Sequence, residues 1–290
     1  MTYSKYLTVV LSGSDCLLWS DCMITVDSNS LTWLLTLSQR KQNVSGKVTP
    51  QVHSLMMRAV GSRLTACSLV KDGLSSLTLL SIPCSGTGNF AISDIEAFLG
   101  ALKYHGGVIK LEIGEDKIML KSSNKQTTMT SSDKALAFPH TSSNVNEWEA
   151  KSVRLATKIN LQDITYQLNS GGKRKPFASW VDINTTTLYE AFRCDNMNNQ
   201  RYNLYTVTSD ERGLCVEVGK NLKGKTISQI DPQPQTVFEA VYMGGLEYVF
   251  KELTGTASIH FFDFRPEGQG IRMLITLGDG DFIFQASNLG

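Results

Sequence analysis

Stretches with apolar residues every three or four positions alternate along the chain with stretches in which apolar and polar residues take turns. The first spacing is typical of one face of a helix, and the second is typical of a half-buried strand. Residues 95–102 follow the helical spacing and precede the alternating runs VIKLEI and KIMLKS, which GEDK separates. Residues 243–250 follow it again and precede SIHFFDF and IRMLITL, which RPEGQG separates. Each segment therefore predicts a helix followed by a β-hairpin.

The same order of elements occurs once more in each half of the chain. Residues 28–42 predict a helix with Ser or Asp at its start, and HSLMMRAVGSRLTACSLV predicts the following hairpin. In the second half INTTTLYEAFRCDN predicts a helix, and YNLYTVTSDERGLCVEV predicts a hairpin that turns at SDERG. The order agrees between the halves, and the later helices place apolar residues at the same offsets from Phe90 and Phe238. We therefore interpret the chain as an internal duplication, with two unrelated α+β domains as the alternative.

A polar stretch separates the two halves. Residues 133–175 are rich in Ser, Asn, Gly and charge, which is typical of a linker, although LATKINLQDITY within them can pair as a strand. We expect an N-terminal domain over residues 1–140, a linker region over 141–178 and a C-terminal domain over 179–290. The basic cluster Lys173, Arg174 and Lys175 is interpreted as part of a solvated loop.

The composition indicates a folded, soluble chain, with 41% hydrophobic and 19% charged residues. A net charge of +1 provides no global attraction to nucleic acid or membrane, so any such binding must come from locally arranged charge. No apolar run approaches the ~20 residues of a membrane span, and the apolar patch near the N-terminus is too short for a signal peptide. We expect a protein that is neither secreted nor inserted in a membrane.

Cysteine and histidine patterns give no sign of a metal or cofactor site. None of the six cysteines forms C-x-x-C, and the four histidines lie far apart without the spacing of zinc ligands. This usage indicates reduced thiols and a cytosolic compartment. We expect no metal and no cofactor, and a metal site assembled only in three dimensions stays open.

One motif points to an enzyme. GKNLKGKT, residues 219–226, fits the phosphate-binding loop G-x-x-x-x-G-K-[ST], which needs a strand before it and a helix after it. GLCVEV predicts the strand, but Pro232 and Pro234 forbid a helix of useful length. We predict a strand over residues 226–230 and a hairpin turn at the Gly and Lys residues. Ser/His/Asp and Cys/His arrangements are also unsupported, so we expect no catalytic residues, with a nucleotide-dependent enzyme that uses Lys225 as the alternative. The other Gly-rich piece, SGTGNF, is expected to be a loop.

Three stretches of the chain resemble DNA sliding clamps. They are FAISDIEAFLGALK followed by VIKLEIGEDKIMLKS, then AFPH, then WVDINTTTLYEAFRCDNMNNQRYNLYTVTSDERGLCVEV, and the C-terminal hairpin IRMLITLGDGDFIFQAS agrees in placement. The likeness covers residues 23–290. It is closest to the two-domain clamps of T-even-like tailed phages and more distant to the proliferating cell nuclear antigen family. Residues 1–22 depart from it as a possible extension or extra strand, the linker is longer, and the chain is less acidic than many clamps.

The resemblance implies an α+β fold of two similar domains, each with two helices packed on antiparallel β-sheet, that assembles into a ring. Two domains in each chain imply three copies, a homotrimer, for a six-domain ring. Such a ring encircles double-stranded DNA without reading its sequence and tethers the replicative DNA polymerase, and a separate clamp loader ATPase opens it. Partner peptides are expected in an outer groove beneath the linker, and the location is the cytoplasm of a host cell, bacterial if the protein is viral. The alternative is a non-enzymatic viral structural or interaction protein with two α+β domains.

The resemblance also implies that Lys and Arg on the helices face the DNA phosphates. Glu96, Glu190 and Glu247 on the same helices weaken this pattern, and a solvated helix face is the other interpretation of each cation. We expect Lys103 and Arg193 to matter most. The full set of expected DNA-facing residues is Arg40, Lys41, Lys103, Arg193, Arg201 and Lys251.

Overall fold

The computed structural model describes residues 22–44, 47–70, 76–114, 117–130, 155–193, 204–218, 226–278 and 280–287. The chain forms two compact units. Unit 1 consists of Met1–Gln39, Val52–Asp72 and Thr78–Thr157, and unit 2 consists of Arg40–Gln51, Gly73–Leu77 and Lys158–Gly290. None of the described helices is long and apolar enough to cross a membrane.

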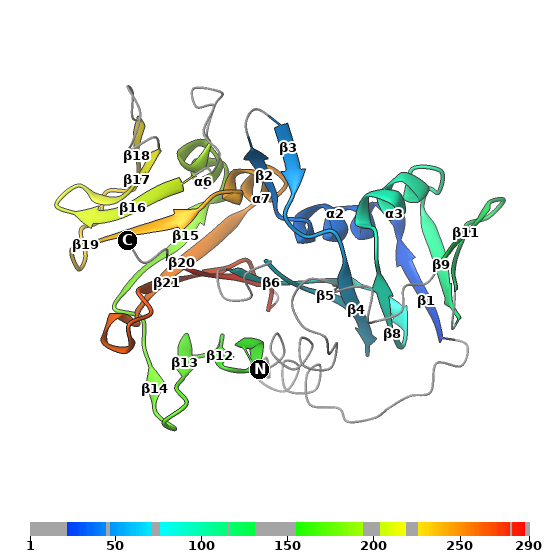
Figure 1. The fold of residues 1–290 in the computed structure, drawn as a ribbon, viewed down its shortest axis with the longest axis horizontal. Coiled ribbons are helices and arrows are strands. Elements are labelled where there is room, and N and C mark those ends of the chain that lie inside the picture. Colours follow the sequence, from blue (N-terminus) through cyan, green and yellow to red (C-terminus); the bar gives the residue numbers. More distant parts are fainter. Residues whose placement is uncertain are drawn as a thin grey trace. The chain divides into compact units, whose positions relative to one another are not determined.

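The described residues of unit 1 include a pair of helices and two antiparallel sets of strands (Figure 1). The helices are α2 (Ser28–Ser38) and α3 (Ile95–Leu102). One set has the order β11-β10-β9-β1-β7, with bounds Gln126–Thr130, Lys117–Lys121, Val108–Ile113, Cys22–Asp27 and Ser85–Gly86. The other has the order β6-β5-β4-β8, with bounds Ser76–Pro83, Arg63–Leu69, Leu55–Val60 and Gly88–Ile92, and most of β6 lies in unit 1.

Unit 2 repeats this plan and adds three small elements. Its helices are α6 (Thr185–Phe192) and α7 (Leu246–Lys251). One set of strands has the order β15-β20-β21-β22, with bounds Ala178–Asn184, Thr256–Asp263, Ile271–Thr276 and Phe282–Ala286. The other has the order β18-β17-β16-β19, with bounds Thr226–Asp231, Gly213–Val218, Leu204–Asp210 and Phe238–Met243. The additions are the hairpin β2 (Lys41–Val44) and β3 (Lys47–Pro50), the sheet β12 (Ile159–Asn160), β13 (Thr165–Gln167) and β14 (Lys173–Arg174), and the 3-10 turn η1 (Arg265–Glu267).

Each unit is itself built from two copies of a strand–helix–three-strand motif. In unit 1 these are β1-α2-β4-β5-β6 and β8-α3-β9-β10-β11, and in unit 2 they are β15-α6-β16-β17-β18 and β19-α7-β20-β21-β22. The strand before each helix pairs with the first strand of the three in the sister motif: β1 with β9, β8 with β4, β15 with β20, and β19 with β16. The predicted fourfold repeat of helix and hairpin is confirmed.

Side-chain caps explain where three of the helices begin. Asp27 accepts a hydrogen bond from the Ser30 backbone N–H at 2.8 Å, and Asp94 accepts one from Ala97 at 2.9 Å. Asn184 does the same for α6. The predicted Ser or Asp at the start of the first helix is thus Asp27. The apolar faces are buried as expected: Leu34, Phe98, Leu102, Leu188, Phe192 and Phe250 are 0–2% exposed.

Several predicted boundaries are wrong. The first helix ends at Ser38 rather than continuing to residue 42, and Lys41–Val44 pairs with Lys47–Pro50 instead. The fourth helix begins at Leu246, because Met243 ends strand β19. SGTGNF is not a loop, because it contributes β7 and part of β8. Gly86, at φ 101°, pairs with Ile24, and a Cβ there would lie 2.0 Å from the Met23 carbonyl oxygen.

The stretch expected to be a linker contains structure of its own. Residues 159–174 form the sheet β12-β13-β14, in line with the expected pairing of LATKINLQDITY. The domain boundaries at residues 140 and 179 stay predictions. Residues 1–21 lie outside the described residues, and β1 begins at Cys22, next to the residue where the clamp-like pattern was expected to start.

Candidate DNA-facing surface

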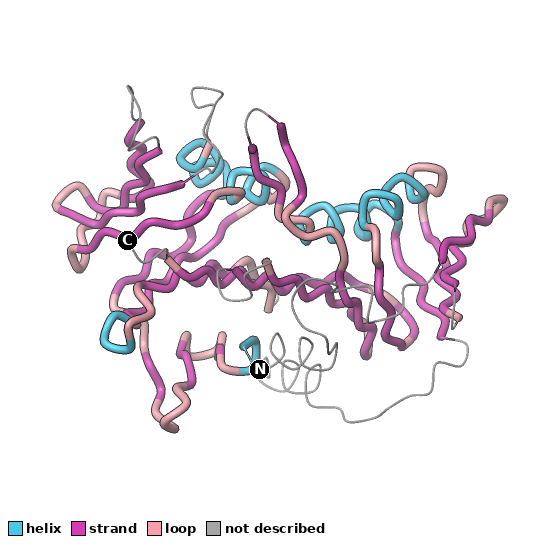
Figure 2. The backbone as a smooth tube through the Cα atoms, viewed as in Figure 1, coloured by secondary structure: helices cyan, strands magenta, loops and turns pink. Residues whose placement is uncertain are grey.

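The two helices of each unit lie side by side along one face of its strands (Figure 2). In unit 2 an aromatic core supports the helix pair. The Phe192 ring of α6 packs 5.4 Å from Phe250 of α7 and edge-on at 5.1 Å from Tyr205 of β16. Because these rings fill the space beneath the helices, the polar faces of the helices point away from the strands.

Three of the expected DNA-facing cations are exposed at helix ends. Lys103 is the C-cap of α3, Arg193 is the C-cap of α6, and Lys251 is the last residue of α7. Cations at these positions also interact favourably with the helix dipole. Their placement therefore has a local structural reason besides any contact with phosphate.

Acidic residues balance these cations on the described helices. Glu96, Glu190 and Glu252 are exposed on α3, on α6 and at the end of α7. Arg193 pairs with Glu190 at 3.5 Å, a surface contact of small energetic value. Helix α2 carries no charged residue at all. The helices themselves thus offer little net positive charge, which limits them to diffuse contact with DNA.

Two expected DNA-facing residues lie on no helix. Arg40 follows α2 and is 1% exposed, so its guanidinium is in the interior of unit 2 rather than on a surface, and we remove it from the candidate set. Lys41 begins strand β2 and is half-buried. Both were expected on a helix that ends too early to include them. Arg201 lies outside the described residues.

The described residues contain no group of three or more His, Cys, Asp and Glu that could hold a metal ion. The two buried histidines bond to hydroxyl groups. His105 Nδ1 lies 3.0 Å from Ser122 Oγ, and its Nε2 lies 2.8 Å from Thr127 Oγ1. His260 Nδ1 lies 2.9 Å from Ser179 Oγ. Burial lowers the pKa of His260 to about 4, so it is a poor general base for Ser179 at neutral pH.

The phosphate-loop motif occurs in the context that was predicted for it. Strand β17 ends at Val218 and pairs with β18, which begins at Thr226 opposite it, so a strand and not a helix follows the motif. Residues 219–225 lie outside the described residues. The motif therefore lacks the helix N-terminus that would bind a phosphate.

Comparisons with known proteins bear on this fold. No family model and no curated protein matches the chain. The DNA polymerase sliding clamp of Bacillus subtilis is similar in structure, with a TM-score of 0.58 and 12% identity over 92% of this chain and 64% of that one. The β-subunit sliding clamp of Pseudomonas aeruginosa bound to griselimycin has a TM-score of 0.56 and 10% identity, over 93% of this chain and 66% of that one. The Helicobacter pylori β clamp bound to a DNA ligase peptide has a TM-score of 0.52 and 12% identity, over 92% of this chain and 67% of that one.

This chain has the DNA sliding-clamp fold. The chain spans 63% of the length of another Helicobacter pylori β clamp structure and 64% of the Bacillus subtilis clamp, which is less than two thirds of each. The similar clamps named here are bacterial, and the expected closeness to the clamps of tailed phages stays a prediction. At this level of identity the likeness concerns the fold.

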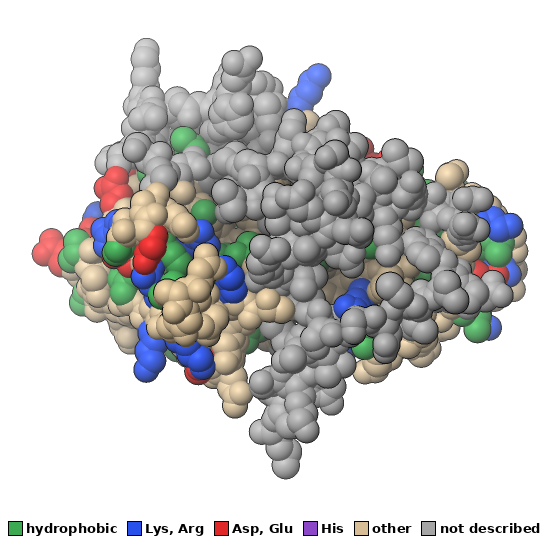
Figure 3. Space-filling model, turned by 60° about the horizontal axis from the view of Figure 1, so that its bottom comes forward, with side chains coloured by type: hydrophobic (Ala, Val, Ile, Leu, Met, Phe, Trp, Pro, Cys, Tyr) green, Lys and Arg blue, Asp and Glu red, His purple; other side chains and the backbone are tan. Residues whose placement is uncertain are grey.

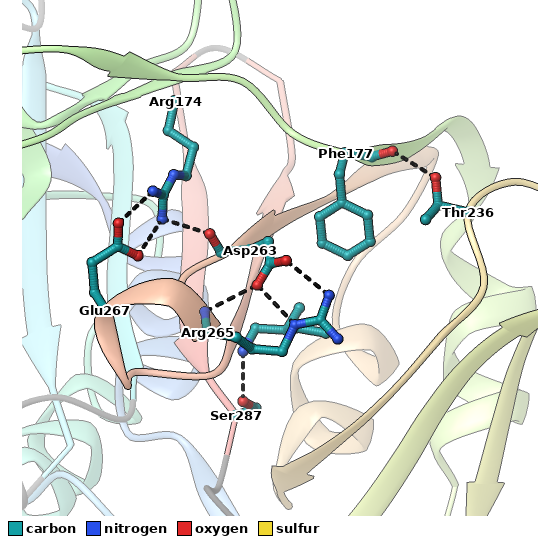
Figure 4. Close-up of polar contacts among 8 residues, drawn as sticks. Arg174, Phe177, Thr236, Asp263, Arg265, Glu267 and Ser287 are labelled. Atoms are coloured by element: carbon teal, nitrogen blue, oxygen red, sulfur yellow. Dashed lines mark hydrogen bonds and ion pairs between the residues drawn. The ribbon is translucent and has the colours of Figure 1, made fainter.

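On this clamp fold, the basic cluster expected in a loop is part of a packed sheet and is largely ion-paired. Lys173 pairs with Asp163 at 3.2 Å, and Arg174 binds both carboxylate oxygens of Glu267 at 2.7 and 2.5 Å (Figure 4). The pKa of the Asp163 carboxyl is lowered mainly by the hydrogen bond from Thr165, with a smaller contribution from Lys173, and that of Glu267 is lowered mainly by the hydrogen bond from Arg174. The expectation of a loop is therefore wrong for Lys173 and Arg174, which form strand β14, although Lys173 is exposed as expected.

Aromatic contacts join the small sheet β12-β13-β14 to the strands of unit 2. Tyr166 of β13 packs edge-on against Phe264 at 5.0 Å and stacks on Phe284 at 5.6 Å. The Arg272 guanidinium lies 4.5 Å from the Phe264 ring. On the side of unit 2 away from α6 and α7, Figure 3 shows Lys and Arg side chains among Asp and Glu side chains. The location of a partner groove stays a prediction.

Proposed function

We propose that this protein is a DNA sliding clamp that encircles duplex DNA independently of sequence and tethers the replicative DNA polymerase. One observation carries the proposal. The four copies of the strand–helix–three-strand motif, in which the first strand of each copy pairs with its sister copy in the same unit, match a sliding clamp over 92% of the chain. The function is topological and needs no active site. A ring that cannot leave the duplex keeps its bound polymerase at a high effective concentration near the primer end.

Strand edges support assembly into a ring. Strands β11 and β18 stand at the ends of their sheets and pair on one side among the described residues. Ile227 of β18 is 41% exposed. An exposed strand edge is a template for pairing with another chain, so edge-to-edge contact between copies would cover both strands. We propose a homotrimer, which has three times the 32.0 kDa of one chain.

Contact with DNA falls to the exposed cations Lys103, Arg193 and Lys251, with Lys41 and Arg201 as further candidates. Each unit contributes few of them, and threefold repetition would multiply their number around the duplex. Reversing Lys103 and Arg193 to Glu should impair clamp-dependent DNA synthesis while light scattering still finds the trimer's mass. Unimpaired synthesis would remove both residues from the DNA-facing set.

The decisive experiment separates encirclement from ordinary binding. A duplex that carries biotin at both ends is incubated with concentrated protein and then blocked with streptavidin. A ring threaded on the DNA should stay on the blocked duplex at a salt concentration that removes it within seconds from an open duplex. Equal release from both would contradict encirclement and favour the alternative, a structural or interaction protein.

Further parts of the proposal follow from the same role. A clamp loader ATPase would open the ring, and polymerase peptides would bind its outer side. The protein itself would hydrolyse no ATP, so ATPase activity lost on Lys225→Ala would contradict this. The site of action would be the cytoplasm of a host cell, a bacterium if the clamp comes from a phage.

A further inference from the structure

The hairpin β2–β3 has no counterpart in the neighbouring motif. It stands between α2 and β4, whereas the sister connection from α3 to β9 runs only from Lys103 to Gly107. Its two strands pair with each other, and the described sheets add no third strand. An isolated two-stranded hairpin is marginally stable in water, so its position has to be held by other contacts.

A buried network holds the base of this hairpin against α7. Arg40 enters the hairpin with φ 48° and is 1% exposed. Burial lowers the pKa of its guanidinium to about 10, and attraction to the Glu247 carboxylate partly offsets this, so Arg40 remains charged at neutral pH. Glu247 also accepts hydrogen bonds from the Tyr205 hydroxyl and, at 3.2 Å, from the Gly245 N–H.

Close backbone contact adds to this anchor. Gly245 has φ 101°, and a Cβ on it would lie 2.5 Å from the Lys41 carbonyl oxygen. Only glycine fits there without a shift of the hairpin. The hairpin is thus fixed beside the first turn of α7, and in Figure 1 it extends on the side of unit 2 where α6 and α7 lie.

Charge distinguishes this hairpin from the helices beside it. The sequence from Ser28 to Lys71 contains no Asp or Glu. Its cations are Arg40, Lys41, Lys47, Arg58, Arg63 and Lys71. Lys47 is exposed at the start of β3 and Lys41 is half-exposed at the start of β2, with no acidic residue between them in the chain. The described helices balance their charges, and the hairpin does not.

We infer that the β2–β3 hairpin is an additional binding element for the phosphate backbone of duplex DNA, held rigidly beside α7 by the Arg40–Glu247–Tyr205 network. The inference rests on the proposed clamp function and assigns part of its DNA contact to Lys41 and Lys47. Ammonium groups contact phosphates as point charges without base readout, which lets a ring slide. Each phosphate contact releases counterions, so it makes binding more sensitive to salt.

The test compares two charge reversals of equal size in the full chain. One variant is Lys41→Glu with Lys47→Glu. The control is Lys110→Glu with Lys117→Glu, whose side chains are exposed on β9 and β10 and alternate with the buried Ile109 and Ile118. Fluorescence anisotropy of a labelled duplex is measured over a potassium chloride series. We expect the hairpin variant to bind about tenfold more weakly at low salt and to lose about two from the slope of log affinity against log salt. The control should change about twofold or less.

The outcomes separate this inference from the proposed function. Equal binding by the hairpin variant and the control, with a wild type that binds, would overturn the inference and leave the clamp intact. A wild type that binds no duplex at any salt would overturn both. If the double variant misfolds by circular dichroism, Lys47→Gln, away from the anchor, decides: a slope reduced by about one supports the inference, and an unchanged slope overturns it. Retained duplex binding with lost polymerase stimulation would assign the hairpin to a protein partner and overturn the DNA assignment.

Discussion

The two units share one topology but protect the outer edge of their first strand differently. In unit 1 the backbone of β7 pairs with β1, which requires Gly86 at a positive φ. In unit 2 a side chain does the same for β15: the Ser179 N–H donates to Gln235 Oε1 at 2.8 Å, and Gln235 Nε2 donates to the Ser179 carbonyl. A strand edge needs partners for its N–H and C=O groups, and either source is sufficient. A duplicated fold can therefore persist while the residues that complete it diverge.

Residues on either side of Gln235 also bond to the segment that contains β15. The Trp180 indole N–H donates to the Gln233 carbonyl at 3.1 Å. The Thr236 hydroxyl donates to the Phe177 carbonyl at 3.3 Å, as Figure 4 shows. These bonds tie the connection between β18 and β19 to the start of β15. Unit 2 thus replaces a short strand with polar side chains in a loop.

A second difference concerns equivalent acidic residues on two helices. Glu96 and Glu247 are each the second residue of their helix, α3 and α7. Glu96 is exposed, whereas Glu247 is 6% exposed, accepts a hydrogen bond from the Tyr205 hydroxyl and interacts electrostatically with the buried Arg40. The same position is therefore a solvated charge in unit 1 and one half of a buried charge pair in unit 2.

The largest predicted effect breaks this pair. Glu247→Ala leaves the buried Arg40 guanidinium without its counter-charge, and we expect a loss of about 3–5 kcal/mol of unfolding free energy. Urea unfolding followed by circular dichroism measures it. Glu96→Ala is the matched control, with an expected change within about 0.5 kcal/mol. Similar losses of stability in the two variants would contradict the role of Glu247 as the counter-charge of Arg40.

The next effect tests the backbone solution in unit 1. Gly86→Ala places a Cβ against the Met23 carbonyl at a positive φ, and we expect a loss of about 2–4 kcal/mol. Gly107→Ala is the control, since Gly107 has φ 68° but no atom within 4 Å of its Cβ, and should lose about 1 kcal/mol. Thermal unfolding of both variants gives the difference, and equal losses would refute the close-contact argument.

Acidification tests the buried histidines, one in each unit. The folded pKa of His260 is about 4 and that of His105 is also lowered, mainly by burial, whereas an unfolded histidine titrates near 6.5. The unfolded state therefore binds more protons between these values, and stability should fall as pH drops from 6.5 towards 4. For His260 the loss is up to about 1.4 kcal/mol per pH unit. His260→Asn should flatten this dependence in unfolding measurements, and a profile unchanged by the substitution would rule His260 out as its source.

The smallest effect tests the side-chain solution in unit 2. Gln235→Ala removes two hydrogen bonds at an exposed edge where water can replace them, so we expect a loss of about 0.5–1.5 kcal/mol. Gln233→Ala is a suitable control, because Gln233 contacts Trp180 through its backbone carbonyl. The rate of hydrogen exchange at the Ser179 amide should rise only in Gln235→Ala. Equal exchange rates in both variants would contradict the proposal that the Gln235 side chain takes the place of a neighbouring strand.

Local chemistry let the sequence predict much of the fold. Asp27 and Asp94 cap their helices through neighbouring N–H groups, and the alternation of apolar residues shows the hairpins directly. The strand after GKNLKGKT was predictable because Pro232 and Pro234 act on their own segment. Of the expected DNA-facing residues, Lys103, Arg193 and Lys251 are exposed on or beside the predicted helices for the same reason.

Only the tertiary structure decided features whose partners are distant in the sequence. The buried Arg40 interacts with Glu247, Gly86 pairs with Ile24 of β1, and Arg174 pairs with Glu267. Periodicity and capping act over a few residues and contain no information about such partners. Burial and ion pairing depend on which segments meet, so the hairpin beside α7 emerged from the fold and not from the pattern of residues 28–50.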